Sequence, residues 1–319
     1  MFAEEFVVFK TVAETNNITL AAKRLHISQP AISLQIQNIE NYYGVKFFVR
    51  SNKGVTVTPA GKVFYKYVCN MLDMLDNVQR EIWRLSGEPH GEVHLGTTLT
   101  IGDYLMPGIL SYAAQAQPHT SFHVKVANTE SVVREVLERG VHIGLVEGPI
   151  ADFHGLNVES FWQDELVAVI SKNHPWAQKE SISLEELAQS NLVLRELGSG
   201  TRKGFEQFLR QRGLSLGDFK VVMELGSVGS IKRVVATGFG VTILSDLAVS
   251  QNPDEDLSVL RVEDMIMYRD LSVITNSANS CLADEEAFFV DLLRDRELVS
   301  LLLSGVSPLE VLAATERSE

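Results

Sequence analysis

The chain has 319 residues, of which 45% are hydrophobic, and its formal net charge is −13. This length exceeds what one small core needs and predicts two or three domains. The sequence holds no run of eighteen apolar residues, and its first residues lack the basic start and unbroken apolar stretch of a signal peptide, so we expect a cytoplasmic protein with no membrane partner. Two cysteines, Cys69 and Cys281, make neither a disulfide framework nor a zinc site.

The charge is distributed unevenly along the chain. Residues 1–87 carry ten Lys and Arg against seven Asp and Glu, a net charge of +3. The other 232 residues carry eighteen against thirty-four, a net charge of −16. This asymmetry is typical of a nucleic-acid-binding end joined to an acidic body. It is also compatible with two ordinary solvated surfaces, so charge alone leaves the function open.

The first 58 residues are predicted to form three helices and a hairpin. Thr19 is expected to cap the second helix and Ser28 the third, with Pro30 in the first turn, where its missing N–H is harmless. Two short β segments joined by a Gly-containing turn predict the hairpin. The expected segments are helices over 3–15, 20–25 and 28–43, and strands over 46–49 and 55–58.

A long helix follows Pro59 and is expected to run from Ala60 to about Leu85. Its apolar residues recur at three- and four-residue steps, and the stripe is about as wide as a coiled-coil seam. Residues 86–91 form a plausible linker. The apolar positions are Val63, Phe64, Tyr67, Val68, Met71, Leu72, Leu75, Val78, Ile82 and Leu85.

From Glu92 onward, strand-like and helix-like segments alternate, which predicts an α/β body with a parallel sheet covered by helices. The last helix is expected over 283–294, and the tail beyond Pro308 is weakly patterned. The predicted strands are 93–98, 121–128, 141–148, 165–171, 191–197, 220–225, 240–245 and 270–276; the predicted helices are 104–116, 131–140 and one around 205–211.

The N-terminal elements have the outline of a winged helix-turn-helix, whose second helix enters the major groove with its first residues towards base edges. Gln suits adenine, small Ala31 suits a thymine methyl, and basic side chains suit phosphates or, on the wing, the minor groove. From periodicity alone, a plain three-helix core with solvated polar residues fits equally well. The candidate DNA-binding residues are Lys23, Arg24, Ser28, Gln29, Pro30, Ala31, Ser33, Gln35, Arg50 and Lys53, with Gln37 as a further polar group.

The stretch from Ile18 to Gly61 closely resembles the N-terminal domain of the LysR-type transcriptional regulators, and the resemblance extends over nearly the whole chain. Phe47 is a mild departure, because the family usually has Leu there. The residues that carry the resemblance are Ala21, Ala22, Leu25, Ser28 to Ser33, Gly44, Phe48, Arg50, Thr58, Ala60 and Gly61.

This resemblance implies partners as well as a fold. It implies binding to double-stranded promoter DNA, and RNA polymerase as a further partner. It also implies that the helix after Pro59 pairs two subunits and that two dimers assemble into a homotetramer on an interrupted palindrome. Only the DNA-facing ends then need a positive field, so the negative total charge is no obstacle.

Ligands in open α/β sheets bind beyond the carboxyl ends of strands, and polar residues gather at four such places. The loop 198–202 is the most informative, because its glycines expose backbone N–H groups, a helix starts there, and Arg202 can clamp a carboxylate or phosphate. Each cluster taken singly is as well explained by helix capping. The four clusters are Thr97, Thr98 and Thr100; Asn128, Thr129 and Glu130; Glu147 and Gly148; and Gly198 to Arg202.

The body resembles the LysR-type effector domain, in which two α/β lobes are joined by two crossings of the chain, here placed near 161–165 and 268–271. The resemblance implies that a small anionic metabolite binds between the lobes. It also implies that Thr98 and Thr100 hold the anionic group, that Thr129 and Thr201 contribute from either lobe, and that Ser227 lines the cleft floor. The expected effector-binding residues are Thr98, Thr100, Thr129, Glu147, Ser199, Gly200, Thr201, Arg202 and Ser227.

The loop 198–202, with the preceding Arg195-Glu196, resembles the corresponding loop in the regulators of cysteine, sulfur or carbon-fixation genes. The expected domains are a winged helix-turn-helix (1–58), a linker helix for dimerisation (59–90), a two-lobed effector domain (91–300) and a tail (301–319). The first lobe is expected to comprise 91–163 and 269–300, and the second 164–267.

Two other classes of function were weighed against regulation. A solute-binding protein has a similar two-lobed body, but the DNA-binding module and the missing signal peptide argue against it. An enzyme is not expected, because the sequence shows no nucleophile motif, metalloprotease motif or paired catalytic carboxylates. We therefore expect no cofactor, no catalytic residue and no metal ligand, and we expect His26, His94, His123 and His142 to be structural or surface groups.

Overall fold

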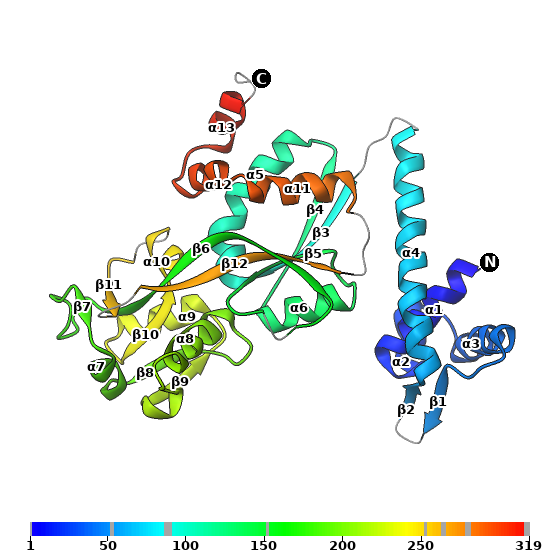
Figure 1. Ribbon diagram of the computed structural model, residues 1–319, viewed down its shortest axis with the longest axis horizontal. Helices are drawn as coiled ribbons and strands as arrows, with labels where there is room; N and C mark the ends of the chain where they lie inside the picture. Colours follow the sequence, from blue (N-terminus) through cyan, green and yellow to red (C-terminus); the bar gives the residue numbers. More distant parts are fainter. Residues whose placement is uncertain are drawn as a thin grey trace. The chain divides into compact units, whose positions relative to one another are not determined.

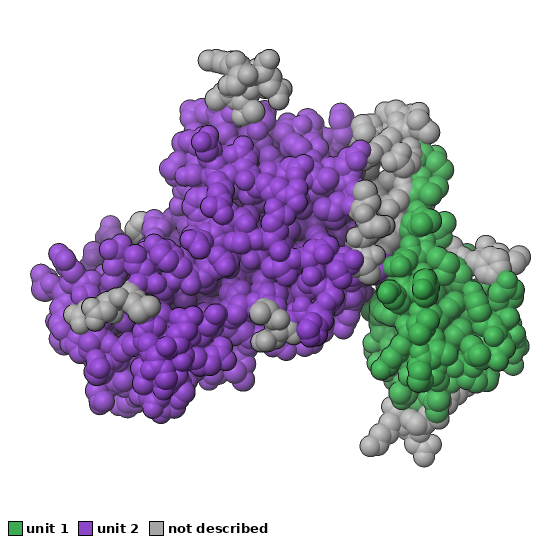
Figure 2. Space-filling view, viewed as in Figure 1, with its two compact units in different colours: residues 1–90 green, residues 91–319 purple. Residues whose placement is uncertain are grey.

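The computed structural model describes residues 2–51, 54–85, 91–150, 153–251, 254–262, 266–277 and 282–315. The chain divides into two compact units, residues 1–90 and residues 91–319 (Figure 2). Each unit has its own hydrophobic core and is described by itself. Within the described ranges, no helix is long and apolar enough to cross a membrane.

The first unit contains three helices, a two-stranded hairpin and a long helix (Figure 1). Their apolar faces close over Phe9, a fully buried side chain whose ring meets Phe47 and Phe64 edge-on. This confirms the expected winged helix-turn-helix. The elements are α1 (Phe2–Thr15), α2 (Ile18–Leu25), α3 (Gln29–Tyr43), β1 (Phe48–Ser51), β2 (Gly54–Val57) and α4 (Pro59–Leu85).

The cap of α2 differs from the prediction. Asn17, not Thr19, caps the helix: its backbone is extended and its Oδ1 accepts a hydrogen bond from Leu20 N at 3.0 Å. The helix therefore begins two residues earlier than expected, which brings Ile18 against the core of the unit. Both residue types cap helices well, so the packing of Ile18 decided between them.

The first strand of the hairpin lies two residues later than predicted, and the second lies one residue earlier. The strands pair antiparallel from Phe48 opposite Val57 to Ser51 opposite Gly54. The N–H groups of Phe47 and Phe48 both bond the Glu40 carboxylate on α3, and strand pairing begins at Phe48. Lys53 lies outside the described residues.

The long helix α4 has two apolar sides. Phe64 and Val68 are buried in the core of the first unit. The other side remains exposed in this single chain, and its apolar residues are Val63, Tyr67, Met74, Leu75, Val78 and Ile82. An exposed apolar stripe of this length is typical of a helix that pairs with a partner helix.

The second unit is built on one ten-stranded sheet in the order β4-β3-β5-β12-β6-β10-β8-β9, with β11 beside β6 and β7 beside β11. Its strands are β3 (Gly91–Thr98), β4 (Thr120–Ala127), β5 (Ile143–Glu147), β6 (Leu156–Ser171), β7 (Ser181–Ile182), β8 (Leu192–Arg195), β9 (Val221–Leu225), β10 (Val241–Ser245), β11 (Leu257–Val262) and β12 (Met267–Asn276).

The sheet is mixed rather than parallel. The outer groups are parallel, β4-β3-β5 at one end and β10-β8-β9 at the other. Between them, β6 and β12 run antiparallel to each other and to their neighbours. Only the apolar ends of these two strands were recognised from the sequence, because their other residues alternate with exposed positions.

Helices cover both faces of the sheet (Figure 1). They fall into two groups, one packed on each of two lobes. The first lobe contains β3 to β5 with α5, α6 and α11, and the second contains β7 to β11 with α7 to α10. The helices are α5 (Met106–Ala116), α6 (Thr129–Leu137), α7 (Leu184–Gln189), α8 (Gly200–Arg210), α9 (Val228–Ala236), α10 (Asp246–Ser250), α11 (Asp284–Arg294), α12 (Arg296–Leu303) and α13 (Pro308–Thr315), with short helical turns η1 (Ile101–Leu105) and η2 (Leu216–Asp218).

The two long strands β6 and β12 pass from one lobe to the other. On β6, Phe161 belongs to the core of the first lobe and Leu166 to that of the second. On β12, Met267 belongs to the second lobe and Leu271 to the first. The two crossings therefore lie side by side in the sheet, within two paired strands.

The C-terminal segment is more ordered than its weak pattern indicated. The expected boundary at residue 300 falls inside α12, and α13 continues to Thr315. Leu298 of α12 and Val311 of α13 are buried and pack against Tyr112 of α5. Short helices carry too few turns to show a clear periodicity, and this packing supplies the stability that the local pattern does not.

Candidate DNA-binding face and effector cleft

The start of α3 is presented outward. The Ser28 hydroxyl caps the helix by accepting from Ala31 N at 3.3 Å, and the next two residues, Gln29 and Pro30, are exposed. Ser33, one turn later, is half-buried. The leading edge of this helix is therefore free of the protein's own interior, as a helix that enters a DNA groove requires.

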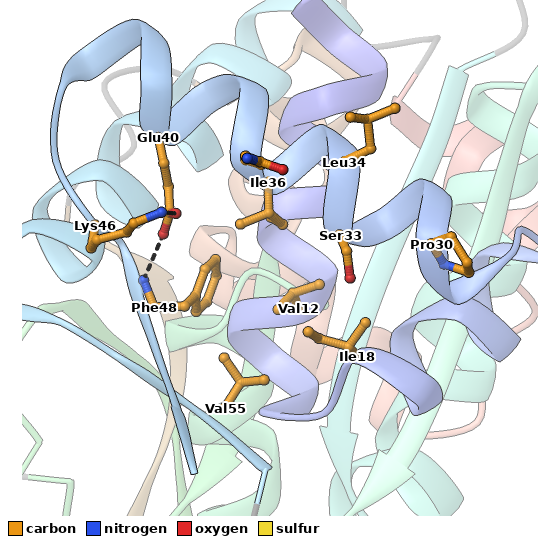
Figure 3. Close-up of a pocket in the computed structure, with 11 residues that line it drawn as sticks. Val12, Ile18, Pro30, Ser33, Leu34, Ile36, Glu40, Lys46, Phe48 and Val55 are labelled. Atoms are coloured by element: carbon orange, nitrogen blue, oxygen red, sulfur yellow. Dashed lines mark hydrogen bonds and ion pairs between the residues drawn. The ribbon is translucent and has the colours of Figure 1, made fainter.

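A cleft of about 560 Å³ lies between α3, the ends of α1 and α2, and the hairpin. Figure 3 shows Pro30, Ser33 and Leu34 along α3, with Ser33 pointing towards Val12 and Ile18. Leu34 is 58% exposed, so the outward face of α3 is partly apolar. The helix contains no Lys or Arg, and its basic neighbours come from the segments on either side of it.

The Glu40 carboxylate fastens α3 to the hairpin. Its Oε1 accepts from the backbone N–H groups of Phe47 at 2.9 Å and Phe48 at 3.2 Å, and its Oε2 pairs with Lys46 Nζ at 2.6 Å (Figure 3). Glu40 itself is buried. A buried carboxylate with this set of donors fixes the position of the hairpin, which is the wing, relative to α3.

The other DNA-binding candidates lie in different settings. Lys23 and Arg24 are exposed at the end of α2, and Arg24 lies 3.7 Å from the Glu14 carboxylate. Ala31 is half-buried, and so is Gln35, whose buried Oε1 has no hydrogen-bond partner in the described part of the chain. Arg50 belongs to β1, but its side chain is outside the described residues.

In the second unit, the predicted polar clusters of the two lobes meet around a buried guanidinium. Arg269 Nη1 donates to Thr201 Oγ1 at 2.8 Å, and its Nη2 donates to Thr100 Oγ1 at 3.4 Å and lies 3.1 Å from Glu147 Oε2. Thr100 also donates to Glu147 Oε1 at 3.3 Å. Residues from both lobes thus share one cation on a crossing strand.

Asp164 completes this cluster from the neighbouring strand. Arg269 and Asp164 are direct cross-strand partners on β12 and β6, and Arg269 Nε donates to Asp164 Oδ2 at 2.7 Å. Ser245 donates to the other carboxylate oxygen at 2.8 Å. Burial by itself lowers the pKa of Arg269, but the adjacent Glu147 and Asp164 carboxylates outweigh it, so the pKa is raised and the cation is retained.

Gly200 allows the two lobes to touch. A Cβ at this position would lie 2.5 Å from Glu147 Cγ and 2.6 Å from Thr129 Oγ1. The Thr129 hydroxyl donates to the Glu147 carbonyl at 3.1 Å, which holds the first-lobe side of this contact in place. The expected residues Thr129, Glu147 and Gly200 are therefore in contact, and only glycine fits at the start of α8.

Besides Glu147 Oε2, which lies 3.1 Å from Arg269 Nη2, three polar atoms near this junction are buried without a hydrogen-bond partner in the described part of the chain. They are the hydroxyls of Thr98, at the end of β3, and Ser199, just before α8, together with Nη1 of Arg195, at the end of β8. The three residues are at most 2% exposed. Buried polar groups normally have partners, so these three atoms are candidates for binding a polar ligand.

Two other candidates occupy different positions. The Arg202 guanidinium already lies 2.9 Å from Glu206 and 2.8 Å from Glu224, and it donates to the Arg195 carbonyl at 3.3 Å. Ser227 is exposed and caps α9 by accepting from Ser230 N. Neither residue is among the partners of the buried cluster.

Sequence reasoning missed three charged residues of this region as contributors. Asp164 and Arg269 lie within strands. The only signal in the sequence is a charged residue at a position of the strand where the alternation predicts a buried side chain. Arg195 was noted only for its resemblance to other regulators. Burial raises the pKa of Asp103 on η1, and the positive charge of Arg195 acts in the opposite direction, which places a cation of the second lobe near a first-lobe carboxyl.

The comparisons with known proteins identify the family. Residues 3–62 match the model of the bacterial regulatory helix-turn-helix protein, lysR family, and residues 86–315 match the LysR substrate binding domain. The chain belongs to the LysR family of transcriptional regulators. This confirms the resemblance. The first unit matches the family's DNA-binding domain, and the two-lobed second unit matches its substrate binding domain.

The relatives support the expected sub-family. The chain is 32% identical to a probable RuBisCO transcriptional regulator of Thalassiosira pseudonana over 86% of this chain and 91% of that one. It is 30% identical to the HTH-type transcriptional regulator CysL of Bacillus subtilis over 92% of this chain and 97% of that one. Both relatives are named as regulators of transcription and not as enzymes.

A solved structure resembles the second unit. The Synechocystis PCC6803 CcmR regulatory domain in complex with 2-PG superposes with a TM-score of 0.58 and 26% identity, covering 64% of this chain and 96% of that one. The two-lobed fold is therefore shared with a regulator whose regulatory domain takes a small ligand.

We predict that Glu40→Ala loosens the wing, because it leaves the N–H groups of Phe47 and Phe48 buried without an acceptor. Each such loss costs about 1–3 kcal/mol. Hydrogen exchange in peptides covering 46–58 should become faster in the full chain. Lys46→Ala is the control: its exposed ion pair contributes about 0–1 kcal/mol, and exchange should change little. Equal acceleration in both variants would contradict the role assigned to Glu40.

We predict that Gly200→Ala separates the lobes, because the added methyl group meets Glu147 and Thr129. Overpacking of this kind costs about 1–3 kcal/mol, so the melting temperature of the second unit should fall. Gly229→Ala, within α9, is the control, because the nearest atoms to its Cβ are 3.9 Å away. A melting temperature at or above the wild-type value for Gly200→Ala would show that the lobes do not meet there.

Proposed function

We propose that this regulator senses a small anionic metabolite between the lobes of its second unit and adjusts its binding to promoter DNA accordingly. The observation that carries the proposal is the set of unpaired buried donors at Thr98, Ser199 and Arg195. Two hydroxyls and a guanidinium N–H are the groups that bind a carboxylate, sulfate or phosphate oxygen. The 2-PG complex of the CcmR regulatory domain supports a small molecule as the ligand.

The remaining expected residues have supporting roles in this proposal. Glu147 is negatively charged and bound to Arg269, so we assign it to holding the hinge rather than contacting the anion. Thr100, Thr129 and Thr201 set the spacing of the lobes around it. We assign Arg202 to holding the end of β8 through its bond to the Arg195 carbonyl, which positions the Arg195 side chain.

For the DNA-binding unit, we propose that α3 enters the major groove, with Gln29, Pro30 and Ser33 towards base edges and Lys23 and Arg24 towards phosphates. The exposure of Gln29, Pro30, Lys23 and Arg24 supports the proposal, and Ser33 lies half-buried one turn later on the same helix. The exposed stripe of α4 supports pairing with a second copy, and a palindromic target follows from a two-fold dimer. A dimer of dimers and RNA polymerase as a partner remain predictions of the family resemblance, and a cytoplasmic location remains a prediction from the sequence.

Effector and DNA are coupled through the conformation of the protein. If a ligand favours one spacing of the lobes, it favours the arrangement of subunits that goes with that spacing. By thermodynamic linkage, DNA must change ligand affinity by the same factor. A coupling free energy on the order of 1–3 kcal/mol is enough for a regulatory response.

The effector site is tested by a thermal-shift screen of sulfur metabolites, sugar phosphates and small carboxylates. Thr98→Val and Ser199→Ala each remove an unpaired hydroxyl, so the free protein should be as stable as wild type or more so. Both variants should lose the shift that the wild type shows with its ligand, while DNA binding without ligand is retained.

Thr242→Val is the matched control for this experiment. Thr242 is also fully buried with an unpaired hydroxyl, but it lies within the second lobe, paired with Val169 of β6 and Val193 of β8. It should keep the ligand shift in full. Equal shifts in wild type and in the Thr98 and Ser199 variants would mean that the ligand binds elsewhere.

DNA recognition is tested by fluorescence anisotropy on the DNA upstream of the protein's own gene. Lys23→Ala should weaken binding to all sequences and reduce the salt slope by about one. Gln29→Ala should relax selectivity at one base pair by about 1–3 kcal/mol. Lys179→Ala, an exposed lysine of the second lobe paired with Glu186, should change neither. Binding that ignores salt and sequence would refute DNA-specific regulation.

A further inference from the structure

Three side chains that the regulatory function does not use lie together on the first lobe. Glu92 and His94 are two residues apart on β3, so they point to the same side of the sheet. His123 on the neighbouring strand β4 is the direct register partner of His94. The two strands are parallel, and β4 is the edge strand of the sheet.

The three side chains converge. The imidazole planes of His94 and His123 are 12° from parallel, with centroids 4.7 Å apart. Glu92 Oε2 lies 3.2 Å from His94 Nε2. One ligand-type atom from each of the three residues lies within 4.8 Å of the other two. Twenty-eight residues intervene between the two histidines, so only the pairing of the strands brings them together.

These side chains have no part in the core. Val93 and Leu95, which alternate with Glu92 and His94 along β3, face the other side of the sheet and are fully buried there. The side chains of Glu92 and His94 are 62% and 46% exposed, and His123 has no hydrogen-bond partner within the described ranges of the chain. They are therefore able to adjust their torsion angles without disturbing the packing of the lobe.

We propose that Glu92, His94 and His123 form a binding site for a divalent transition-metal ion, with Zn²⁺ as the best match. Two imidazoles and one carboxylate are a ligand set that suits Zn²⁺ and not Ca²⁺ or Mg²⁺, which take oxygen ligands. Tetrahedral Zn²⁺, with bonds of about 2.0–2.1 Å, needs ligand atoms roughly 3.3 Å apart. The Glu92–His94 pair already has this spacing, and rotation of the exposed His123 brings in the third ligand, with water as the fourth.

The bound ion would join the edge strand β4 to β3 through side chains, in addition to the backbone ladder between them. It would therefore reduce local opening of the edge of the sheet. Because both imidazoles must be neutral to bind the ion, metal affinity should fall at acidic pH. This device is independent of the effector cleft, since none of the three residues belongs to it.

The site is tested on the full-length chain without a histidine tag. Co²⁺ serves as the spectroscopic probe, and Zn²⁺ is then added as a competitor. We expect one equivalent of Co²⁺ to give the visible absorption of a low-coordinate complex, and Zn²⁺ to displace it. Hydrogen exchange in peptides covering 91–98 and 120–127 should slow when Zn²⁺ is bound.

His94→Gln and His123→Gln should each weaken Zn²⁺ binding at least about tenfold, because even outer partners of a metal site are worth about 10–100-fold in affinity. His119→Gln, an exposed histidine just before β4, is the control and should bind like the wild type. Absence of one-equivalent binding, or an affinity unchanged in the His94 and His123 variants, would overturn the proposal. Loss of binding in His119→Gln of the same size would do so as well.

Discussion

The arrangement of the second unit depends on one buried ion cluster, formed where the two long strands cross between the lobes. Arg269 and Asp164 face each other across β12 and β6, and both side chains are at most 1% exposed. Glu147 joins from the first lobe. Removing one member would leave a buried charge unpaired, at a cost of about 3–5 kcal/mol. The crossing strands are therefore held in one register.

The same cluster lies beside the groups that we propose to bind a ligand. Thr100 of the first lobe and Thr201 of the second both accept hydrogen bonds from Arg269. A ligand that draws Thr98 and Ser199 together moves the segments that carry these two threonines. In that proposal, the buried cation links the ligand-binding groups to the crossing strands, where a small movement of these groups becomes a change in the spacing of the lobes.

The first unit uses a carboxylate in a comparable way. Glu40 is buried on α3 and receives two backbone N–H groups from the chain that enters the hairpin. The recognition helix and the wing therefore keep a fixed relation to each other, which a protein needs if both are to contact one DNA duplex. In both units, a buried charge is stable because its hydrogen-bond partners are supplied by the fold.

Local signals in the sequence determined the helices, the hairpin and most strands. The cap at Ser28, the turn after Arg50 and the long stripe of α4 each depend on residues a few positions apart, and the motif from Ala21 to Gly61 indicated the family. Tertiary structure decided what depends on distant partners. Asp164 and Arg269 are 105 residues apart, and the antiparallel course of β6 and β12, the contact at Gly200 and the packing of α13 also join distant segments. A sequence shows the periodicity of an element, but the register between elements is set only when their cores close.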